Sequence, residues 1–162
     1  MKRPTQRIRR LATAFAVLLV AANPVRADDN RPGSSAAWLP AYRQECASCH
    51  VAYPPGLLPA ESWQRLLRNL PNHFGTDASL DPASVQALSV WLSANAGTAR
   101  RVWEAPPQDR ITTSAWFIRQ HDEVPAAAWK RPSIKSPANC SACHAQADQG
   151  NFNEHDVRIP AR

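Results

Sequence analysis

Two copies of the pattern Cys-x-x-Cys-His constrain this chain more than any other feature. The first is "CASCH" at residues 46–50, and the second is "CSACH" at residues 140–144. Together they use all four cysteines of the 162-residue sequence. Any fold must therefore hold two such units far apart in the sequence and must explain why a histidine directly follows each pair.

The spacing of these residues is that of a covalent haem attachment site. Two residues between the cysteines put both sulfurs on one side of a helical turn, where each can add to one vinyl group at the porphyrin edge. The adjacent histidine then faces the iron as its proximal ligand. The sequence thus predicts two haem c groups with His50 and His144 as proximal iron ligands. The predicted attachment residues are Cys46, Cys49, Cys140 and Cys143.

Other cysteine chemistries explain the pattern less well. Two disulfides would leave His50 and His144 without a role, and a four-thiolate zinc site usually joins its cysteine pairs in one knuckle. A thioredoxin-like motif expects a βαβ pattern nearby, which this sequence lacks. A thiol or zinc protein would be colourless, so an absorption spectrum decides between these classes.

Few other side chains can serve as a sixth iron ligand. The only methionine is Met1, which lies in the leader segment considered below, so His/Met ligation is excluded. The remaining histidines are His73, His121 and His155. Two bis-histidine haems fit this inventory, and such ligation predicts low-spin iron with a lower potential than a His/Met site.

His73 and His121 are the predicted distal ligands. His73 lies in the loop "LPNHFGTD", which can cross a haem face, and His121 ends "TTSAWFIRQH". A helix there would put Phe117 and His121 on one apolar face with Ile118 beside them. The alternatives are a solvated histidine at 73 and a helix-dipole partner at 121, and His155 is interpreted as a surface residue. Sequence order does not decide which iron each histidine meets.

The first thirty residues are typical of an export signal. Five basic residues precede an apolar run over residues 11–22, and Val25-Arg26-Ala27 offers small residues for cleavage after Ala27. We therefore expect residues 1–27 to be a cleaved signal peptide and the mature protein to be periplasmic. An uncleaved anchor is the alternative, although the run is short for a bilayer and no later segment is apolar enough to span one.

Export changes the meaning of the basic net charge. The chain has 19 Lys and Arg against 13 Asp and Glu, but six of the basic residues and none of the acidic ones precede residue 28. The mature chain is formally neutral, and it lacks the basic stripe with interleaved aromatics expected of a nucleic-acid-binding protein. Four ionised propionates would outweigh the charge of two ferric haems. The loaded protein is therefore expected to be negative and to attract a redox partner with a basic patch.

Hydrophobic periodicity predicts an all-α chain. Residues 38–50 are expected to form a helix leading into the first haem motif, after which Pro54-Pro55 imposes an extended loop. A proline carbonyl in that loop is a candidate acceptor for the Nδ1 hydrogen of His50. The alternative is that the prolines only end the helix. Asp81 is the predicted N-cap of a further helix, and Gly97 is its predicted left-handed stop. The predicted buried positions of the two central helices are Trp63, Leu66, Leu67, Leu70, Val85, Leu88 and Leu92.

The chain is predicted to consist of two haem-binding regions joined by a linker. The C-terminal region looks too small to bury a haem alone, so we expect it to pack against the first. Arg100, Arg101 and Arg110 of the linker are candidates to bind haem propionates, and the alternative is a solvated run of charges. The predicted limits are a signal peptide at 1–27, a flexible tail at 28–37, a cytochrome-c-like domain at 38–98, a linker at 99–110 and a C-terminal segment at 111–162.

Several stretches of the chain resemble the periplasmic dihaem cytochromes c, often called DHC. The resemblance covers residues 38–160 and rests on "ECASCHVAYPPGLLPAESW", "HFGTDASL", "RITTSAWFIRQH" and "ANCSACHAQADQGNF". It implies a small helical domain like class I cytochrome c and a second haem held by a largely irregular C-terminal segment with short helices. It also implies bis-histidine ligation, with His50 and His144 proximal and His73 and His121 distal. Gln120 departs from the family pattern, where an acidic residue is expected.

The resemblance implies electron transfer as the function. Members of the family pass electrons to a small oxygen-binding monohaem cytochrome and are often found with a b-type membrane cytochrome. The residues themselves contain no nucleophile with a base and no surplus metal cluster, which favours an electron carrier over an enzyme. The alternative is a gas-binding or peroxidase-like haem protein with one open iron site, which would follow if His121 only capped its helix.

Overall fold

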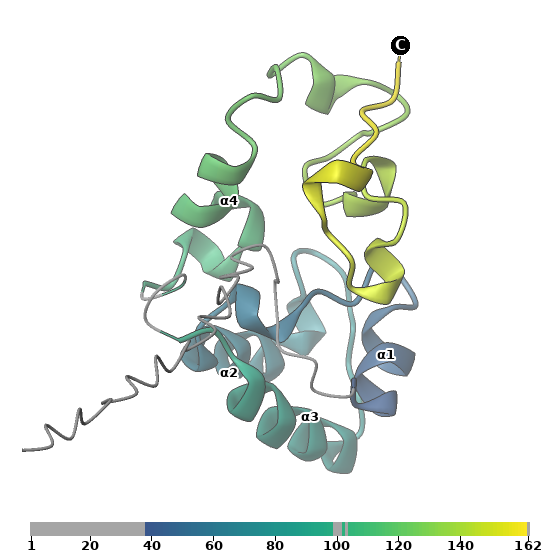
Figure 1. Cartoon of the computed structure of the whole chain (residues 1–162). Coiled ribbons are helices and arrows are strands. Elements are labelled where there is room, and N and C mark those ends of the chain that lie inside the picture. The colour runs from purple at the N-terminus through teal and green to yellow at the C-terminus, as the bar shows by residue number, and fades with distance from the viewer. Residues whose placement is uncertain (1–37, 99–101, 103, 162) are drawn as a thin grey trace, which may run out of the picture.

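The computed structural model describes residues 38–98, 102 and 104–161, and this part of the chain is all-α (Figure 1). No strand forms in it, and bridges between extended residues are limited to His73 with Thr76 and His144 with Val157. The α-helices are α1 (Pro40–Cys46), α2 (Ala60–Arg68), α3 (Pro82–Asn95) and α4 (Ala115–Gln120). The 3-10 turns span Pro55–Leu57, Leu70–Asn72, Pro107–Asp109, Ile111–Thr113, Ala128–Lys130, Cys140–Ala142, Ala147–Gln149 and Glu154–Asp156.

Some sequence predictions concern residues outside the described part. These are the signal peptide at 1–27, the tail at 28–37, and the linker arginines Arg100 and Arg101. Within the described residues, no helix combines the length and the apolar character that crossing a bilayer requires.

Helices α1, α2 and α3 enclose the main hydrophobic core. Leu88 and Leu92 of α3 are fully buried beside Tyr42 of α1 and Trp63 of α2. The rings of Tyr42 and Trp63 meet edge to face, with centroids 6.3 Å apart. Asp81 is the N-cap of α3, as predicted, since its carboxylate accepts hydrogen bonds from the backbone amides of Ala83 and Ser84. Most of the predicted stripe is buried in this core, whereas Leu66 and Val85 pack against it and are only partly buried.

Gly97 ends α3 for a reason other than the predicted one. Its φ is not positive, and Ala96 before it is extended, so no left-handed stop forms. Instead, the Gly97 amide donates to the Leu58 carbonyl at 2.8 Å. A Cβ atom here would lie 2.5 Å from the Gly56 carbonyl oxygen and 2.6 Å from Val102 Cγ2. Glycine is required by close packing of two chain segments rather than by a helix cap.

Helix α1 is shorter than the predicted helix over 38–50. It begins at Pro40, whose fixed φ suits the first helical position, and it ends at Cys46. The Ser48 hydroxyl donates to the Glu45 carbonyl at 3.1 Å, which offers that carbonyl a partner other than the next helical amide. The second half of the haem motif therefore lies in a turn, and the chain leaves the helix between the two cysteines.

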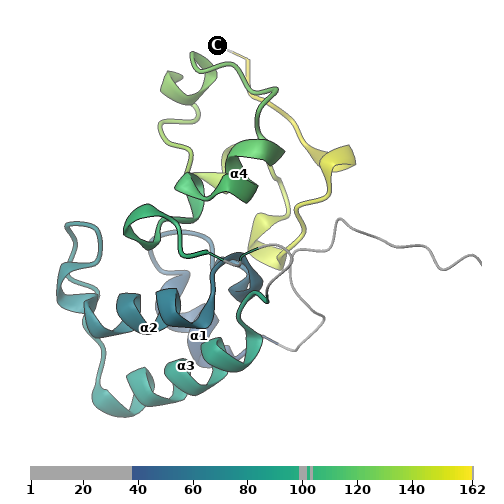
Figure 2. The same ribbon diagram turned by 90° about the vertical axis from the view of Figure 1, so that its left-hand side faces the viewer.

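The C-terminal region contains one short α-helix and a series of 3-10 turns. Ser114 caps α4, with its hydroxyl accepting from the Phe117 amide at 3.0 Å. Figures 1 and 2 show this region as a second tier beyond α1, α2 and α3. Low helix content leaves the region with little core of its own, so its position depends on contacts with the first tier.

Two contacts join the C-terminal tier to α1 and the residues before it. Arg43 donates to the Asp148 carbonyl at 3.0 Å. Gly150 has a φ of 76°, and a Cβ there would lie 2.9 Å from Cζ2 of Trp38. Only glycine combines this backbone conformation with such an approach. The two regions pack together, as the small size of the second one predicts.

Candidate haem sites

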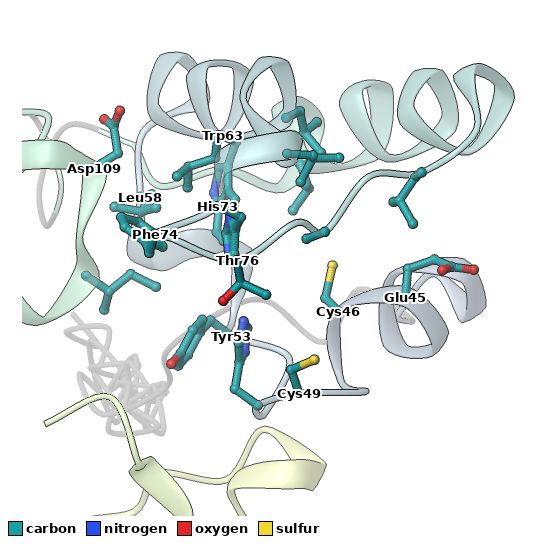
Figure 3. A pocket seen from close by; sticks show the side chains of 18 of the residues that line it. Glu45, Cys46, Cys49, Tyr53, Leu58, Trp63, His73, Phe74, Thr76 and Asp109 are labelled. Atoms are coloured by element: carbon teal, nitrogen blue, oxygen red, sulfur yellow. The ribbon is translucent and has the colours of Figure 1, made fainter. Parts of the chain in front are cut away.

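The first site is a cavity of about 560 Å³ in the N-terminal region (Figure 3). Cofactor sites typically have volumes of about 300–1,000 Å³. Helix α1 and the turn after it bring Cys46 and Cys49 to one side of the cavity, and the loop after α2 brings His73 to the other. His50, which follows Cys49, also lines the cavity. Much of the remaining lining is apolar, with Leu58, Trp63, Leu66, Leu67, Leu70 and Leu92. A mostly apolar cavity with cysteines and histidines on facing walls suits a planar, apolar iron cofactor.

The distance between the two histidines of this cavity fits one shared metal ion. The ring centres of His50 and His73 are 6.3 Å apart, and their planes differ by 24°. A transition metal binds an imidazole nitrogen at about 2 Å. Two such nitrogens on opposite sides of one iron lie about 4 Å apart, and their ring centres about 6 Å apart. The residues present therefore fit a haem iron between them.

The two histidines differ in their second nitrogen. His50 Nδ1 lies 2.7 Å from the carbonyl oxygen of Val51, which can orient the ring. Of the two interpretations of Pro54-Pro55, the proline acceptor is wrong, because Val51 provides the carbonyl near His50 Nδ1 and the Pro55 carbonyl accepts from the Trp63 indole. His73 Nδ1 is buried without a hydrogen-bond partner. Burial lowers the pKa of His73, which favours the neutral imidazole that binds metals.

The loop that carries His73 is a tight reversal. His73 and Thr76 exchange two backbone hydrogen bonds of 2.8 and 3.1 Å, and Phe74 and Gly75 between them have φ values of 53° and 92°. The Arg110 guanidinium lies over the Phe74 ring, 4.2 Å from its centre. Arg110 also lines the cavity. This is the position expected of an arginine that binds a haem propionate, the role that the sequence suggests for it.

The second pair, His121 and His144, has nearly the same separation and a different orientation. The ring centres are 6.2 Å apart and the planes differ by 78°. His121 stacks on Phe117 at 4.0 Å, and its Nδ1 lies 2.9 Å from the Phe117 carbonyl oxygen. The helical spacing predicts this shared face, but Ile118 is wrongly placed on it and is 58% exposed. Trp129 packs beside His121 at 5.9 Å.

The four cysteines do not pair with one another. In the described part of the chain, none forms a disulfide, and no group of three or more metal-binding side chains comes together. Burial raises the pKa of Cys46 and of Cys140 to about 11. Zinc and redox chemistry use the thiolate, which such burial disfavours. In the described residues the cysteines therefore lie as two separate pairs and not as one four-thiolate metal site.

His155, the remaining histidine, belongs to neither pair. It lies exposed in the turn Glu154–Asp156, in accord with its interpretation as a surface residue.

Tyr53 contacts the first site, although the sequence assigns it no role. Its ring stacks on His50 at 4.7 Å, and its hydroxyl donates to the Ala138 carbonyl at 3.0 Å. The only sequence signal is an aromatic residue between the first haem motif and Pro54, which does not reveal a partner 85 positions away.

Two histidine pairs beside two Cys-x-x-Cys-His motifs in an all-α chain define a c-type cytochrome with two haem sites. Comparison with known proteins agrees with this class. The dihaem cytochrome c family, DHC, matches residues 42–152, and the chain belongs to this family. It accordingly carries two covalently bound haem c groups.

Solved structures of similar proteins come from two bacteria. The diheme cytochrome c of Shewanella baltica OS155 is 42% identical, covers 75% of this chain and 92% of its own, and superposes with a TM-score of 0.65. The diheme cytochrome c of Rhodobacter sphaeroides is 44% identical over 72% of this chain and 98% of its own, with a TM-score of 0.63. A structure of DHC purified from the same organism is 45% identical over 70% and 96%, with a TM-score of 0.61. No curated protein sequence matches the chain.

Proposed function

We propose that this protein is a periplasmic, low-potential electron carrier with two bis-histidine haems. Cys46 and Cys49 would attach the first haem, and His50 and His73 would bind its iron. The second haem would be attached by the second motif, with His144 and His121 on its iron. The two haem-binding regions are assigned to residues 38–98 and 111–162, joined by a linker at 99–110.

The separation of the two histidine pairs is the observation that carries this proposal. Centroid distances of 6.3 and 6.2 Å are those expected when two imidazoles share one iron. Each pair joins the histidine of a haem motif to one of the predicted distal histidines. The crossed pairing that sequence order left open is disfavoured, because His50 lies against His73 and His144 lies against His121.

The side chains around each pair perform the tasks that electron transfer requires. A bound haem c supplies an iron that alternates between the ferric and ferrous states. His50 and His121 can donate their Nδ1 hydrogens to the carbonyls of Val51 and Phe117, which holds the rings in place. If both histidines of each pair bind the iron, no coordination position would be left for a substrate. Histidine ligation on both sides also gives a lower potential than a His/Met site.

The redox partners follow from the family resemblance and from charge. We propose a b-type membrane cytochrome as donor and a soluble haem protein, such as an oxygen-binding monohaem cytochrome, as acceptor. The mature chain is formally neutral. Four propionates would make the loaded protein negative, so a partner with a basic patch would be steered toward it. Association with the partner should then slow as ionic strength rises.

Absorption spectra of the purified holoprotein test the ligation. We expect sharp low-spin bands in the oxidised and dithionite-reduced states and no change when CO is added to the reduced protein. H73A and H121A should each convert one haem to a high-spin form that binds CO. H155A is the matched control and should leave the spectrum unchanged. CO binding by the unmodified protein would instead support the rival function, a gas-binding or peroxidase-like haem protein.

A further inference from the structure

Tyr53 lies between the two haem-attachment segments and contacts both. It stands three positions after His50 and stacks on that ring, with centroids 4.7 Å apart and planes 21° apart. Its hydroxyl reaches the Ala138 carbonyl, two positions before Cys140. We propose that Tyr53 is a positioning residue that couples the two haem sites, holding the plane of the His50 imidazole against the segment that carries the second haem. The proposal rests on the proposed role of His50 as an iron ligand.

The first half of the coupling is the orientation of the His50 ring. An imidazole bound to iron through one nitrogen can still rotate about that bond. The Val51 carbonyl near Nδ1 restrains this rotation from one side. The near-parallel Tyr53 ring restrains it from the face, since tilting His50 would separate the stacked rings. A shift of Tyr53 would therefore turn the proximal ligand of the first haem.

The second half of the coupling is the rigidity of the acceptor. Ala138 lies in a closed turn, in which the Ser136 hydroxyl accepts from the Ala138 amide at 3.1 Å. The Asn139 side-chain amide donates to the carbonyl of Ile134, which is fully buried, at 3.0 Å. The Tyr53 hydroxyl is thus bonded to a backbone oxygen that its own segment holds in place. Movement at Cys140 would be transmitted to Tyr53 rather than absorbed by a mobile loop.

Tyr53 is also anchored to the N-terminal core through its backbone. The Tyr42 hydroxyl donates to the Tyr53 carbonyl at 2.7 Å, and Tyr42 is buried among the helices. This bond provides a matched control. Y42F and Y53F each remove one tyrosine hydroxyl that donates to a backbone carbonyl. Only the Tyr53 hydroxyl reaches the segment of the second haem.

Electron paramagnetic resonance of the oxidised holoprotein separates a coupling role from simple packing. We expect Y53F, which keeps the stack but loses the tie, to shift the signals of both haems. Y42F should leave the signal of the second haem unchanged, and Y53L should alter the first-haem signal more than Y53F does. A Y53F spectrum that superimposes on the wild-type spectrum would overturn the proposal. So would an equal shift of the second signal in Y42F.

Amide hydrogen exchange gives an independent readout. The Ala142 amide donates to the Asn139 carbonyl, and the amides of Cys143 and His144 donate to the Cys140 carbonyl. In Y53F their exchange should accelerate on the order of 2- to 10-fold, the range that one neutral hydrogen bond contributes, and in Y42F it should not. Haem content and circular dichroism confirm that each variant is loaded and folded. Unchanged exchange in Y53F would contradict the tie.

The wild-type spectra test the proposed function separately. They report whether both irons are low-spin and closed to CO, whereas the difference between Y53F and wild type reports on Tyr53. The Tyr53 proposal uses only His50 and the second attachment segment. The difference between Y53F and wild type therefore still tests the role of Tyr53 if a distal ligand proves to be another residue.

Discussion

The two haem sites start from the same five-residue pattern and are held in different ways. The N-terminal motif follows α1 and is backed by a core of α2 and α3 that includes Leu88 and Leu92. The C-terminal motif lies in a 3-10 turn, and aromatic side chains make up much of its surroundings, with Phe117 and Trp129 at His121 and Phe152 at His144. The second motif therefore has no long helix of its own behind it. The neighbouring N-terminal region supplies the helical core instead.

The histidine pairs of the two sites differ in orientation and in hydrogen bonding. The rings are 24° from parallel in the first pair and 78° in the second. In the first, the motif histidine His50 has a carbonyl near its Nδ1, whereas in the second it is His121, outside the motif, that has one. The motif therefore sets where its own histidine lies, while local packing sets the planes and the partners of the rings.

The largest expected effect is that of removing one haem attachment site. C140A/C143A should lower the haem content to one per chain and disorder the C-terminal region, while most helical circular dichroism remains because the α1–α3 core does not use that haem. C46A/C49A should lose much more helix, because the cavity lies inside the helical core. Haem-to-protein ratios and far-ultraviolet spectra measure both. Complete unfolding of C140A/C143A would show that the N-terminal region does not stand alone.

Cavity-forming substitutions in the two regions should destabilise different parts of the chain. Leu88 and Ile134 are both 0% exposed, the first in α3 and the second in the C-terminal region. L88A should lower the free energy of unfolding by about 2–5 kcal/mol. I134A should unfold the C-terminal region at a lower urea concentration than the rest of the chain. It should shift the unfolding transition seen by circular dichroism less than L88A does. Urea titrations followed by circular dichroism and by haem absorbance compare them, and coincident shifts in both variants would mean that the regions unfold as one unit.

The ring planes predict two distinguishable low-spin signals. Near-parallel imidazoles split the two iron orbitals that they overlap, so the first haem should give a rhombic signal with three resolved g values. Near-perpendicular imidazoles leave those orbitals almost degenerate, so the second haem should give one large, strongly anisotropic g value. Electron paramagnetic resonance at low temperature checks this, and C140A/C143A should retain only the rhombic signal. Two identical signals would contradict the difference in ring orientation between the two sites.

The smallest expected effect concerns an ion pair between α2 and the linker. Arg65 donates to Asp109 through Nε at 2.9 Å and through Nη2 at 2.7 Å, and this guanidinium holds the pKa of Asp109 below its usual range. A folded pKa below the unfolded value of about 4 means that the pair stabilises the fold above that pH. The contribution is lost as the pH falls through the folded pKa.

D109N should therefore lower the melting temperature slightly at neutral pH and have no effect at the acid end. The difference should be small, because the Arg65 side chain is partly exposed and water screens the pair. Asparagine tolerates the positive φ of 55° at this position, so the backbone should not add strain. Thermal melts of the two proteins between neutral and acidic pH measure it. A difference that persists at the lowest pH would show that the pair is not its cause.

Much of the fold was predictable because local rules act alone there. Asp81 caps α3 and Leu88 and Leu92 are buried because capping and helical periodicity need no distant partner. Gly97 and the end of α1 were not predictable in the same way. The first depends on the approach of Gly56, and the second on a side-chain bond from Ser48 inside the motif. These two contacts form only in the folded chain, so the sequence pattern does not reveal them.

The sequence by itself determined the chemistry of this protein. Cysteines adjacent to histidines at short spacing form an attachment site through a single turn, and a sequence whose only methionine is Met1 predicts histidine for the remaining ligands. The tertiary structure decided what depends on residues far apart in the chain. It brought His73 to His50 and His121 to His144, it set the angles of the rings, and it joined Tyr53 to Ala138. The physical reason is that packing fixes distances and orientations between segments whose local sequence carries no record of each other.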